Sequence, residues 1–347
     1  MSQAHLSTLW KKGTDFLGSK HAILGGAMSW VSERNLVAAI SNAGGFGVIA
    51  ASSMPPHLLE AEIEATKKLT KHQFGVNLIT MHPQLEELAD VCIRQKVSHV
   101  VLAGGLPKAS IIAKLKEGGA KVVGFAPAVS LAKKLVKDGV DALVIEGHEA
   151  GGHIGPVSTS VLAQEILPFA AENMPHVPVF VAGGIGRGEA IAAYLEMGAA
   201  GVQLGTRFVC AHESIAHANF KRSFIKASAR DAEPSVQIDP EFPVIPVRAI
   251  ANKASKEFAA VQVEVINQFR KGELQKLEAQ LKIEHYWAGA LRRAVIDGDV
   301  ETGSLMAGQS VGMVTKEQST QEIIDELVAQ AEHFLAHRAA KPQAKRA

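Results

Sequence analysis

The sequence predicts an α/β fold, a (β/α)₈ TIM barrel with a small helical cap inserted after the eighth strand. Eight short and almost entirely apolar runs recur before residue 206, and segments with apolar residues at helical spacing separate them. Runs without polar alternation are typical of parallel strands that are covered on both faces. Glycines such as Gly118, Gly139 and Gly198 end helices just before the next strand. This alternation favours a barrel over a doubly wound open sheet, which usually has fewer strands.

The expected strands are residues 21–24, 46–51, 74–79, 99–103, 121–126, 142–146, 177–182 and 201–205. Between them, apolar residues recur on one side of each segment, as Leu85, Leu88 and Cys92 do in the segment before the fourth run. This spacing places one apolar helix face against the sheet.

After the eighth strand the barrel needs only one more helix, yet more than a hundred residues remain. Residues 232–247 are rich in proline and acidic residues, residues 255–281 are helical in pattern, and residues 317–338 form an amphipathic helix. We therefore expect a barrel of residues 21–230 and 285–338, with a helical cap of residues 231–284 over its mouth. The basic tail 339–347 is expected to be disordered.

The overall composition excludes several classes of protein. The net charge is +1, and no basic stripe with interleaved aromatic residues indicates a nucleic-acid partner. No run reaches the ~20 apolar residues of a membrane span, and residues 1–20 lack the pattern of a signal peptide. Cys92 and Cys210 lie in apolar segments, which indicates buried thiols in a reducing compartment. We expect a cytoplasmic protein.

Active sites of α/β barrels lie at the carboxyl ends of the strands. The adjacent glycines of Gly25-Gly26-Ala27-Met28 follow the first strand, where they suit either close approach of a flat ligand or a tight turn. Asn77 interrupts the apolar third strand, so its amide needs hydrogen-bond partners. Either a polar ring system or a neighbouring backbone could supply them.

The sixth strand ends in Glu146-Gly-His-Glu149-Ala-Gly151-Gly152-His153. A zinc-protease motif needs two residues between the glutamate and the second histidine, and three stand here, so we reject a metal site. His153 is then the candidate general acid or base. His148 is interpreted as structural, and the remaining histidines as ordinary surface residues.

Glycine-rich turns also end the last two strands, as Ala182-Gly183-Gly184 and Gly205-Thr206-Arg207. Barrels of this kind commonly bind phosphate at these two turns through backbone amides. The run from Gly184 to Gly188 is one residue short of the six-residue dinucleotide-binding pattern. It also follows the seventh strand, whereas that pattern follows the first strand of its domain. A phosphate cradle beside one histidine indicates a planar phosphorylated cofactor. FMN suits it better than PLP, because no lysine stands at a strand end.

Five motifs in this order resemble the nitronate monooxygenase (2-nitropropane dioxygenase) superfamily, which includes the enoyl-acyl carrier protein reductase II enzymes. They are Gly26-Ala-Met-Ser-Trp30, Phe74-Gly-Val-Asn77, Glu146–Gly155, Ala182-Gly-Gly-Ile185 and Val202-Gln-Leu-Gly-Thr-Arg-Phe208. The resemblance implies FMN in the barrel and His153 as the catalytic histidine. The cofactor-binding residues it implies are Gly25, Gly26, Ala27, Met28, Asn77, Glu146, Gly151, Gly152, Ala182, Gly183, Gly184, Gln203, Gly205 and Thr206.

The C-terminal third, through motifs such as Val247-Arg-Ala-Ile250 and Gly303-Ser-Leu-Met-Ala-Gly-Gln309, is closest to the enoyl reductase II branch. Leu24 departs from the superfamily, where glutamine is common and contacts the flavin. The leading hypothesis is reduction of a 2-enoyl thioester, on acyl carrier protein or free, with NADH or NADPH as co-substrate. Oxidation of alkyl nitronates by oxygen is the alternative, and a non-catalytic flavin-binding module is a third. A homodimer is one open expectation for the assembly.

Overall fold

The computed structural model describes residues 2–239, 242 and 244–340, and it confirms the predicted TIM barrel. Eight parallel strands follow the order β1-β9-β8-β6-β5-β4-β3-β2, and a bridge between Leu24 and Phe46 joins the two ends. The barrel strands are β1 (Ile23–Gly25), β2 (Val48–Ala50), β3 (Gly75–Ile79), β4 (His99–Ala103), β5 (Lys121–Phe125), β6 (Ala142–Glu146), β8 (Val179–Ala182) and β9 (Gly201–Leu204).

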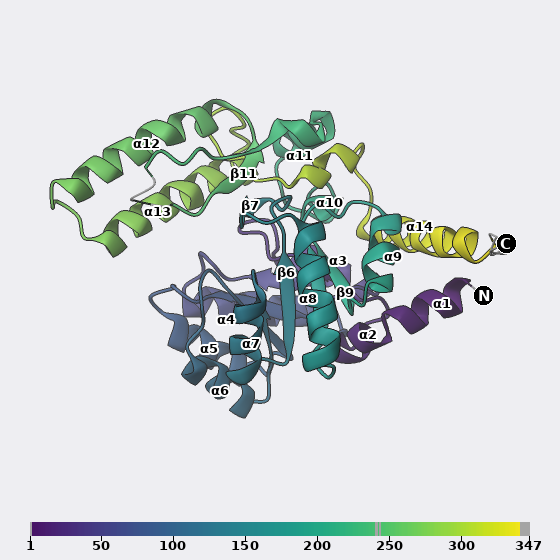
Figure 1. Ribbon diagram of the computed structural model, residues 1–347. Helices are drawn as coiled ribbons and strands as arrows, with labels where there is room; N and C mark the ends of the chain where they lie inside the picture. Colours follow the sequence, from purple (N-terminus) through teal and green to yellow (C-terminus); the bar gives the residue numbers. More distant parts are fainter. Residues whose placement is uncertain (1, 240–241, 243, 341–347) are drawn as a thin grey trace, which may run out of the picture.

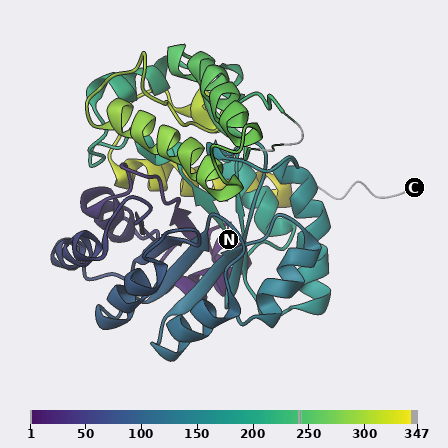
Figure 2. The same cartoon turned by 90° about the vertical axis from the view of Figure 1, so that its left-hand side faces the viewer.

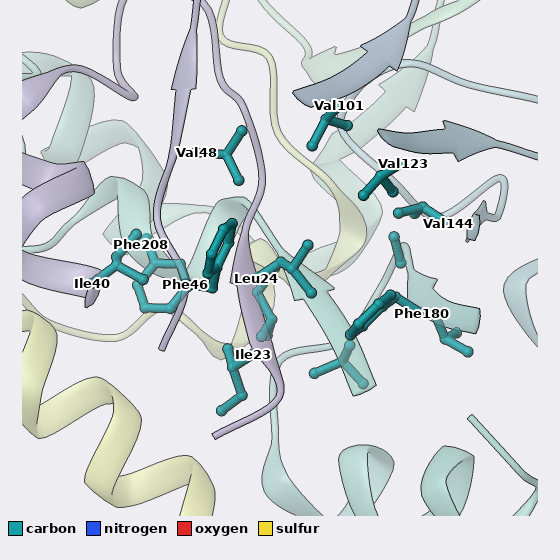
Figure 3. Close-up of a cluster of buried hydrophobic side chains, with 14 of the residues drawn as sticks. Ile23, Leu24, Ile40, Phe46, Val48, Val101, Val123, Val144, Phe180 and Phe208 are labelled. Carbon is teal, nitrogen blue, oxygen red and sulfur yellow. The ribbon is translucent and has the colours of Figure 1, made fainter. Parts of the chain in front are cut away.

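Helices alternate with these strands and cover the outside of the barrel (Figure 1). They are α3 (Arg34–Asn42), α4 (Pro56–Leu69), α5 (Leu85–Arg94), α6 (Ala109–Glu117), α7 (Val129–Lys137), α8 (Thr159–Asn173), α9 (Gly188–Glu196) and α14 (Thr320–Ala340). The barrel interior is filled by branched and aromatic side chains, among them Leu24, Val101, Val144 and Phe180 (Figure 3). In the described residues, no helix is both long and apolar enough to cross a lipid bilayer.

Two N-terminal helices, α1 (Ser2–Leu9) and α2 (Lys11–Leu17), precede the barrel. The ring of Phe16 packs 5.0 Å from the ring of His99 and 6.2 Å from that of Phe180, near the start of β4 and β8. Helix α2 therefore closes the amino end of the barrel. The prediction that histidines other than His148 and His153 lie on the surface is wrong for His99 and His21, which are 0% and 7% exposed. Both lie at the start of a predicted strand, where packing against the N-terminal helices covers them.

The cap extends from the carboxyl ends of the strands (Figures 1 and 2). Its helices are α10 (Thr206–Val209), α11 (Ala218–Lys226), α12 (Lys253–Arg270) and α13 (Lys276–Val295), with short 3₁₀ turns at η1 (Ala229–Asp231) and η2 (Gln309–Met313). Helices α12 and α13 form a hairpin with a second hydrophobic core around Phe258 and Trp287. The expected helix 255–281 is thus wrong as one piece, because the chain turns at Gly272, whose φ is 76°.

The expected cap boundary at residue 284 falls inside α13. At the other end, residues 339 and 340 continue α14, and the rest of the expected tail, 341–347, lies outside the described residues.

A small antiparallel sheet joins the cap to the barrel mouth. Its order is β10-β11-β7, from β10 (Ala232–Pro234), β11 (Val247–Ile250) and β7 (Gly152–His153). The sequence did not indicate this sheet beside the expected helical cap, because strands of two to four residues are too short to show alternation. The pairing places His153 opposite Val247 and fixes the backbone of the loop that follows β6.

Candidate active site

Three of the expected site residues form one layer at the carboxyl end of the barrel. Glu146 pairs in register with Ala182, and Ala182 pairs with Gln203. Residues in register on parallel strands point to the same face of the sheet. Val144 and Phe180, two residues earlier on β6 and β8, fill the barrel interior (Figure 3), so this layer faces the barrel mouth.

Asn77 lies on β3 and is 4% exposed. Its Nδ2 donates to the carbonyl oxygen of Val101 on the neighbouring strand at 3.0 Å. The sequence left two kinds of partner open for this amide. One of them, the neighbouring backbone, accepts one of its hydrogen bonds. Gln203 on β9 is also buried, at 8% exposure. Both amides stand at the mouth end of otherwise apolar strands.

The turns after β1 and β9 approach each other through glycines. A Cβ on Gly26 would lie 3.4 Å from Cα of Gly205, and a Cβ on Gly205 would lie 3.4 Å from Sδ of Met28. The hydroxyl of Ser32 fixes the first turn, since it accepts from the amide of Met28 at 3.0 Å and donates to the carbonyl of Gly26 at 2.9 Å. The two turns therefore approach through backbone atoms at Gly26 and Gly205, with the Met28 side chain beside Gly205.

Trp30, in the same turn, was not among the expected site residues. Its φ is 66°, which is unfavourable for a bulky residue, and its buried indole Nε1 has no hydrogen-bond partner in the described part of the chain. The guanidinium of Arg292 on α13 lies 5.8 Å from the centre of the ring, so this residue also contacts the cap. In the sequence, the only signal for Trp30 is that an aromatic residue follows the glycine motif.

The turn after β8, which the sequence predicts as a phosphate cradle, contains two residues with left-handed backbone. Gly183 and Gly184 have φ of 99° and 71°, which favours glycine, and a Cβ on Gly183 would lie 2.7 Å from Oγ1 of Thr159. Successive amides in such a turn form a concave anion-binding surface. Thr159, the first residue of α8, fixes the turn because its hydroxyl donates to the carbonyl of Gly183 at 3.0 Å.

Thr206 supplies a hydroxyl next to this cradle, at the end of β9. Its Oγ1 accepts a hydrogen bond from the amide of Gly308 at 2.9 Å, and the side chain is 8% exposed. The hydroxyl proton has no acceptor among the described residues. A buried donor without an acceptor is costly, which is the situation that a bound phosphate oxygen would relieve.

The titratable candidates Glu146 and His153 lie at the end of β6 and in the segment that follows it. The imidazole of His148 bonds to the carbonyl of Gly155 at 2.9 Å, which matches a structural role. The side chain of His153 is exposed at the mouth. Glu146 lies deeper and is half-buried, and burial raises the pKa of its carboxyl to about 7, against the opposing charge of His153. The carboxyl of Glu146 can therefore store a proton near neutral pH at the barrel mouth.

Residues 304–309 connect three segments at the barrel mouth, a role that the sequence did not indicate. The amide of Gln309 donates to the carbonyl of Glu149 at 2.9 Å, while the amide of Gly308 bonds to Thr206. Met306 forms a bridge to Ala249 of β11. The segment therefore connects the loop after β6, the turn after β9 and the small sheet.

The two cysteines take no part in this site. Cys92 and Cys210 are 0% and 1% exposed, which confirms that they are buried, and burial raises the pKa of each thiol to about 12. Thiols in this state are poor nucleophiles. In the described part of the chain, no three histidine, cysteine, aspartate or glutamate side chains cluster as metal ligands.

Barrel and site together define an oxidoreductase of the TIM-barrel class. The chain belongs to the nitronate monooxygenase family, whose model matches residues 11–95 and 88–330. A curated relative from Rhodococcus jostii (strain RHA1), named (3aS,4S,5R,7aS)-5-hydroxy-7a-methyl-1-oxo-octahydro-1H-indene-4-carboxyl-CoA dehydrogenase, is 31% identical over 94% of this chain and 97% of its own. A probable nitronate monooxygenase of Staphylococcus aureus (strain MSSA476) is 26% identical over 95% of this chain and 100% of its own.

Solved structures show the same fold. FabK from Thermotoga maritima superposes with a TM-score of 0.83 and 35% identity, covering 94% of this chain and 97% of FabK. The nitroalkane oxidase of Streptomyces ansochromogenes has a TM-score of 0.77 over 94% of this chain and 99% of its own; at 24% identity it shows the fold alone.

Proposed function

We propose that the protein is an FMN-dependent oxidoreductase that reduces 2-enoyl thioesters with NADH or NADPH. The observation that carries this choice of substrate is a small, partly open apolar pocket of about 80 Å³ between the cap and the loop after β3. It is lined by Met81, Val244, Ile245, Leu277, Gln280, Leu281 and Ile283. An acyl chain would bury its methylene groups there, at about 0.8 kcal/mol each, whereas a small nitronate has no chain to bury.

The residues at the barrel mouth fit FMN. Gly183, Gly184 and Thr206 would hold its phosphate, through amides that line a turn where Cβ atoms would clash and through a buried hydroxyl that lacks an acceptor. Asn77 and Gln203 would face the ring. When bound, FMN would supply the two-electron transfer between the nicotinamide and the substrate.

The protein side chains would supply the proton that the reaction needs. Reduction of the double bond adds a hydride to the β-carbon and a proton to the α-carbon of the thioester. His153, exposed at the mouth, would donate this proton or hydrogen-bond the thioester carbonyl. Glu146, whose pKa is about 7, would hold a proton behind it.

Steady-state assays with crotonyl-CoA and 2-octenoyl-CoA test the proposal. NAD(P)H consumption that matches formation of the saturated thioester, with the longer substrate preferred, supports it. Absence of turnover with either thioester contradicts it.

Oxidation of alkyl nitronates is the second candidate. The family model and the Staphylococcus aureus relatives carry that activity in their names. The same histidine would then hydrogen-bond and stabilise the nitronate, or form it by removing the acidic α-proton of a nitroalkane. Oxygen consumption with propyl-2-nitronate, without NAD(P)H, would select this function.

A further inference from the structure

The loop that carries His153 needs an external support. It contains Gly151 and Gly152, and Gly152 has a φ of 77°, so the loop backbone has little rigidity of its own. Its main chain is held from outside by the pairing of β7 with β11, by the bond from Gln309 to Glu149 and by further hydrogen bonds. The amide of His148 bonds to Val157 at 2.7 Å, and that of Ile154 bonds to Pro246 at 2.9 Å.

Arg248 lies directly behind this loop. It stands opposite Gly152 in the pairing of β11 with β7, and it is 2% exposed. Its Nε donates to the carbonyl of His148 at 3.1 Å, and its Nη1 donates to the carbonyl of Ala232 on β10. One planar guanidinium thus connects the start of the catalytic loop to the far strand of the small sheet.

Burying the charged guanidinium of Arg248 costs folding free energy, which indicates that the residue has a function. Within residues 2–239, 242 and 244–340, no carboxylate lies within 4.0 Å of its guanidinium. Burial lowers the pKa of Arg248, and only the more distant charge of Glu149 opposes that shift. A buried cation without a direct counter-ion destabilises a fold, so two carbonyl bonds alone are poor compensation.

We infer that Arg248 is a positioning residue, which holds the His148–Gly152 backbone so that the imidazole of His153 faces the substrate and Glu146. The inference rests on the proposed function only for the role of His153. Lysine would not replace the arginine fully, because one ammonium lacks the planar fork that reaches two carbonyls.

Hydrogen exchange of the purified full-length protein tests this directly. In Arg248→Met, the amides of His148, Ala150 and Ile154 should exchange about tenfold faster or more, because a hydrogen bond from a charged donor has been lost. Arg248→Lys should give a smaller increase. Arg293→Met is the matched control, since its exposed guanidinium also donates to a carbonyl, that of Thr302 at 3.0 Å, outside the loop.

The second readout is the titration of Glu146. If His153 moves away, its charge no longer lowers the pKa of this carboxyl, so the titration should shift upward in Arg248→Met and not in Arg293→Met. The carboxyl infrared band of Glu146, identified with Glu146→Gln, reports the shift. With enoyl-CoA substrates, kcat should fall about tenfold or more while KM changes little.

Unchanged exchange and an unchanged Glu146 titration in both Arg248 variants would overturn the inference. Should the methionine variant fail to fold, the lysine variant gives the same comparison. The exchange measurement needs no substrate, so it decides the role of Arg248 even if the wild-type protein reduces no thioester.

Discussion

Gly151 and Gly308 pack backbone to backbone at the barrel mouth. A Cβ on Gly151 would lie 2.4 Å from the amide nitrogen of Gly308, and a Cβ on Gly308 would lie 2.9 Å from the carbonyl oxygen of Glu149. The loop before His153 and the segment after Met306 therefore occupy positions that exclude any side chain. This contact sets the height of the loop above the barrel.

Gly308→Ala should lower the free energy of unfolding by about 1–3 kcal/mol, because the added methyl group meets backbone atoms that have no free rotation. It should also weaken FMN binding, because the amide of Gly308 orients Thr206. Thermal melts and FMN titration of the apoprotein measure both effects. Gly155→Ala, in the loop that faces this segment, is the control, since a Cβ there would meet nothing within 4 Å. Equal behaviour of the two variants would contradict the account.

His153→Gln should lower kcat by about 10²–10⁴, the usual contribution of a general acid, while FMN affinity stays unchanged. His285→Gln, at an exposed position on α13, should behave as wild type. Stopped-flow measurement should show normal reduction by NAD(P)H and slow reoxidation by 2-octenoyl-CoA. Full reoxidation rates in His153→Gln would remove this residue from the mechanism.

Glu146 should make the apoprotein less stable as pH rises from 4.5 to 7. The folded carboxyl keeps its proton until about pH 7, whereas an unperturbed one loses it near 4.5, so the unfolded state releases its proton first. Glu146→Gln removes this dependence and should raise stability at neutral pH. Urea unfolding of wild type, Glu146→Gln and the surface control Glu172→Gln across this range measures it. Parallel pH curves for all three would show that Glu146 does not titrate in this way.

His21 should have the opposite effect on stability, at lower pH. Burial lowers the pKa of its ring from 6.5 to about 4, so the unfolded state takes up a proton first and stability falls as pH drops from 6.5 to 4. His21→Phe keeps the packing on Trp10 and removes a buried Nδ1 that has no partner in the described residues. The free energy of unfolding of His21→Phe, minus that of wild type, should be about 2 kcal/mol larger at pH 5 than at pH 7. Urea unfolding at the two pH values tests this, and an equal difference at both would contradict it.

The barrel was predictable from the sequence because apolar runs define its strands, and the candidate site residues were proposed where polar residues interrupt those runs. Asn77, Glu146 and Gln203 all stand out in this way. The supporting residues were not predictable. Arg248 acts through the pairing of a two-residue strand, and Gly308 acts through a contact with Gly151, and such tertiary contacts leave no periodic pattern. The burial of His99 follows from α2, whose position against the barrel no local pattern indicates.

The most direct test of the thioester reductase is an anaerobic bleaching trial on the purified, FMN-loaded protein. NADH or NADPH should bleach the flavin absorbance, 2-octenoyl-CoA should then restore it, and propyl-2-nitronate should leave it unchanged. Bleaching by the nitronate, with no response to either nicotinamide, would contradict the account.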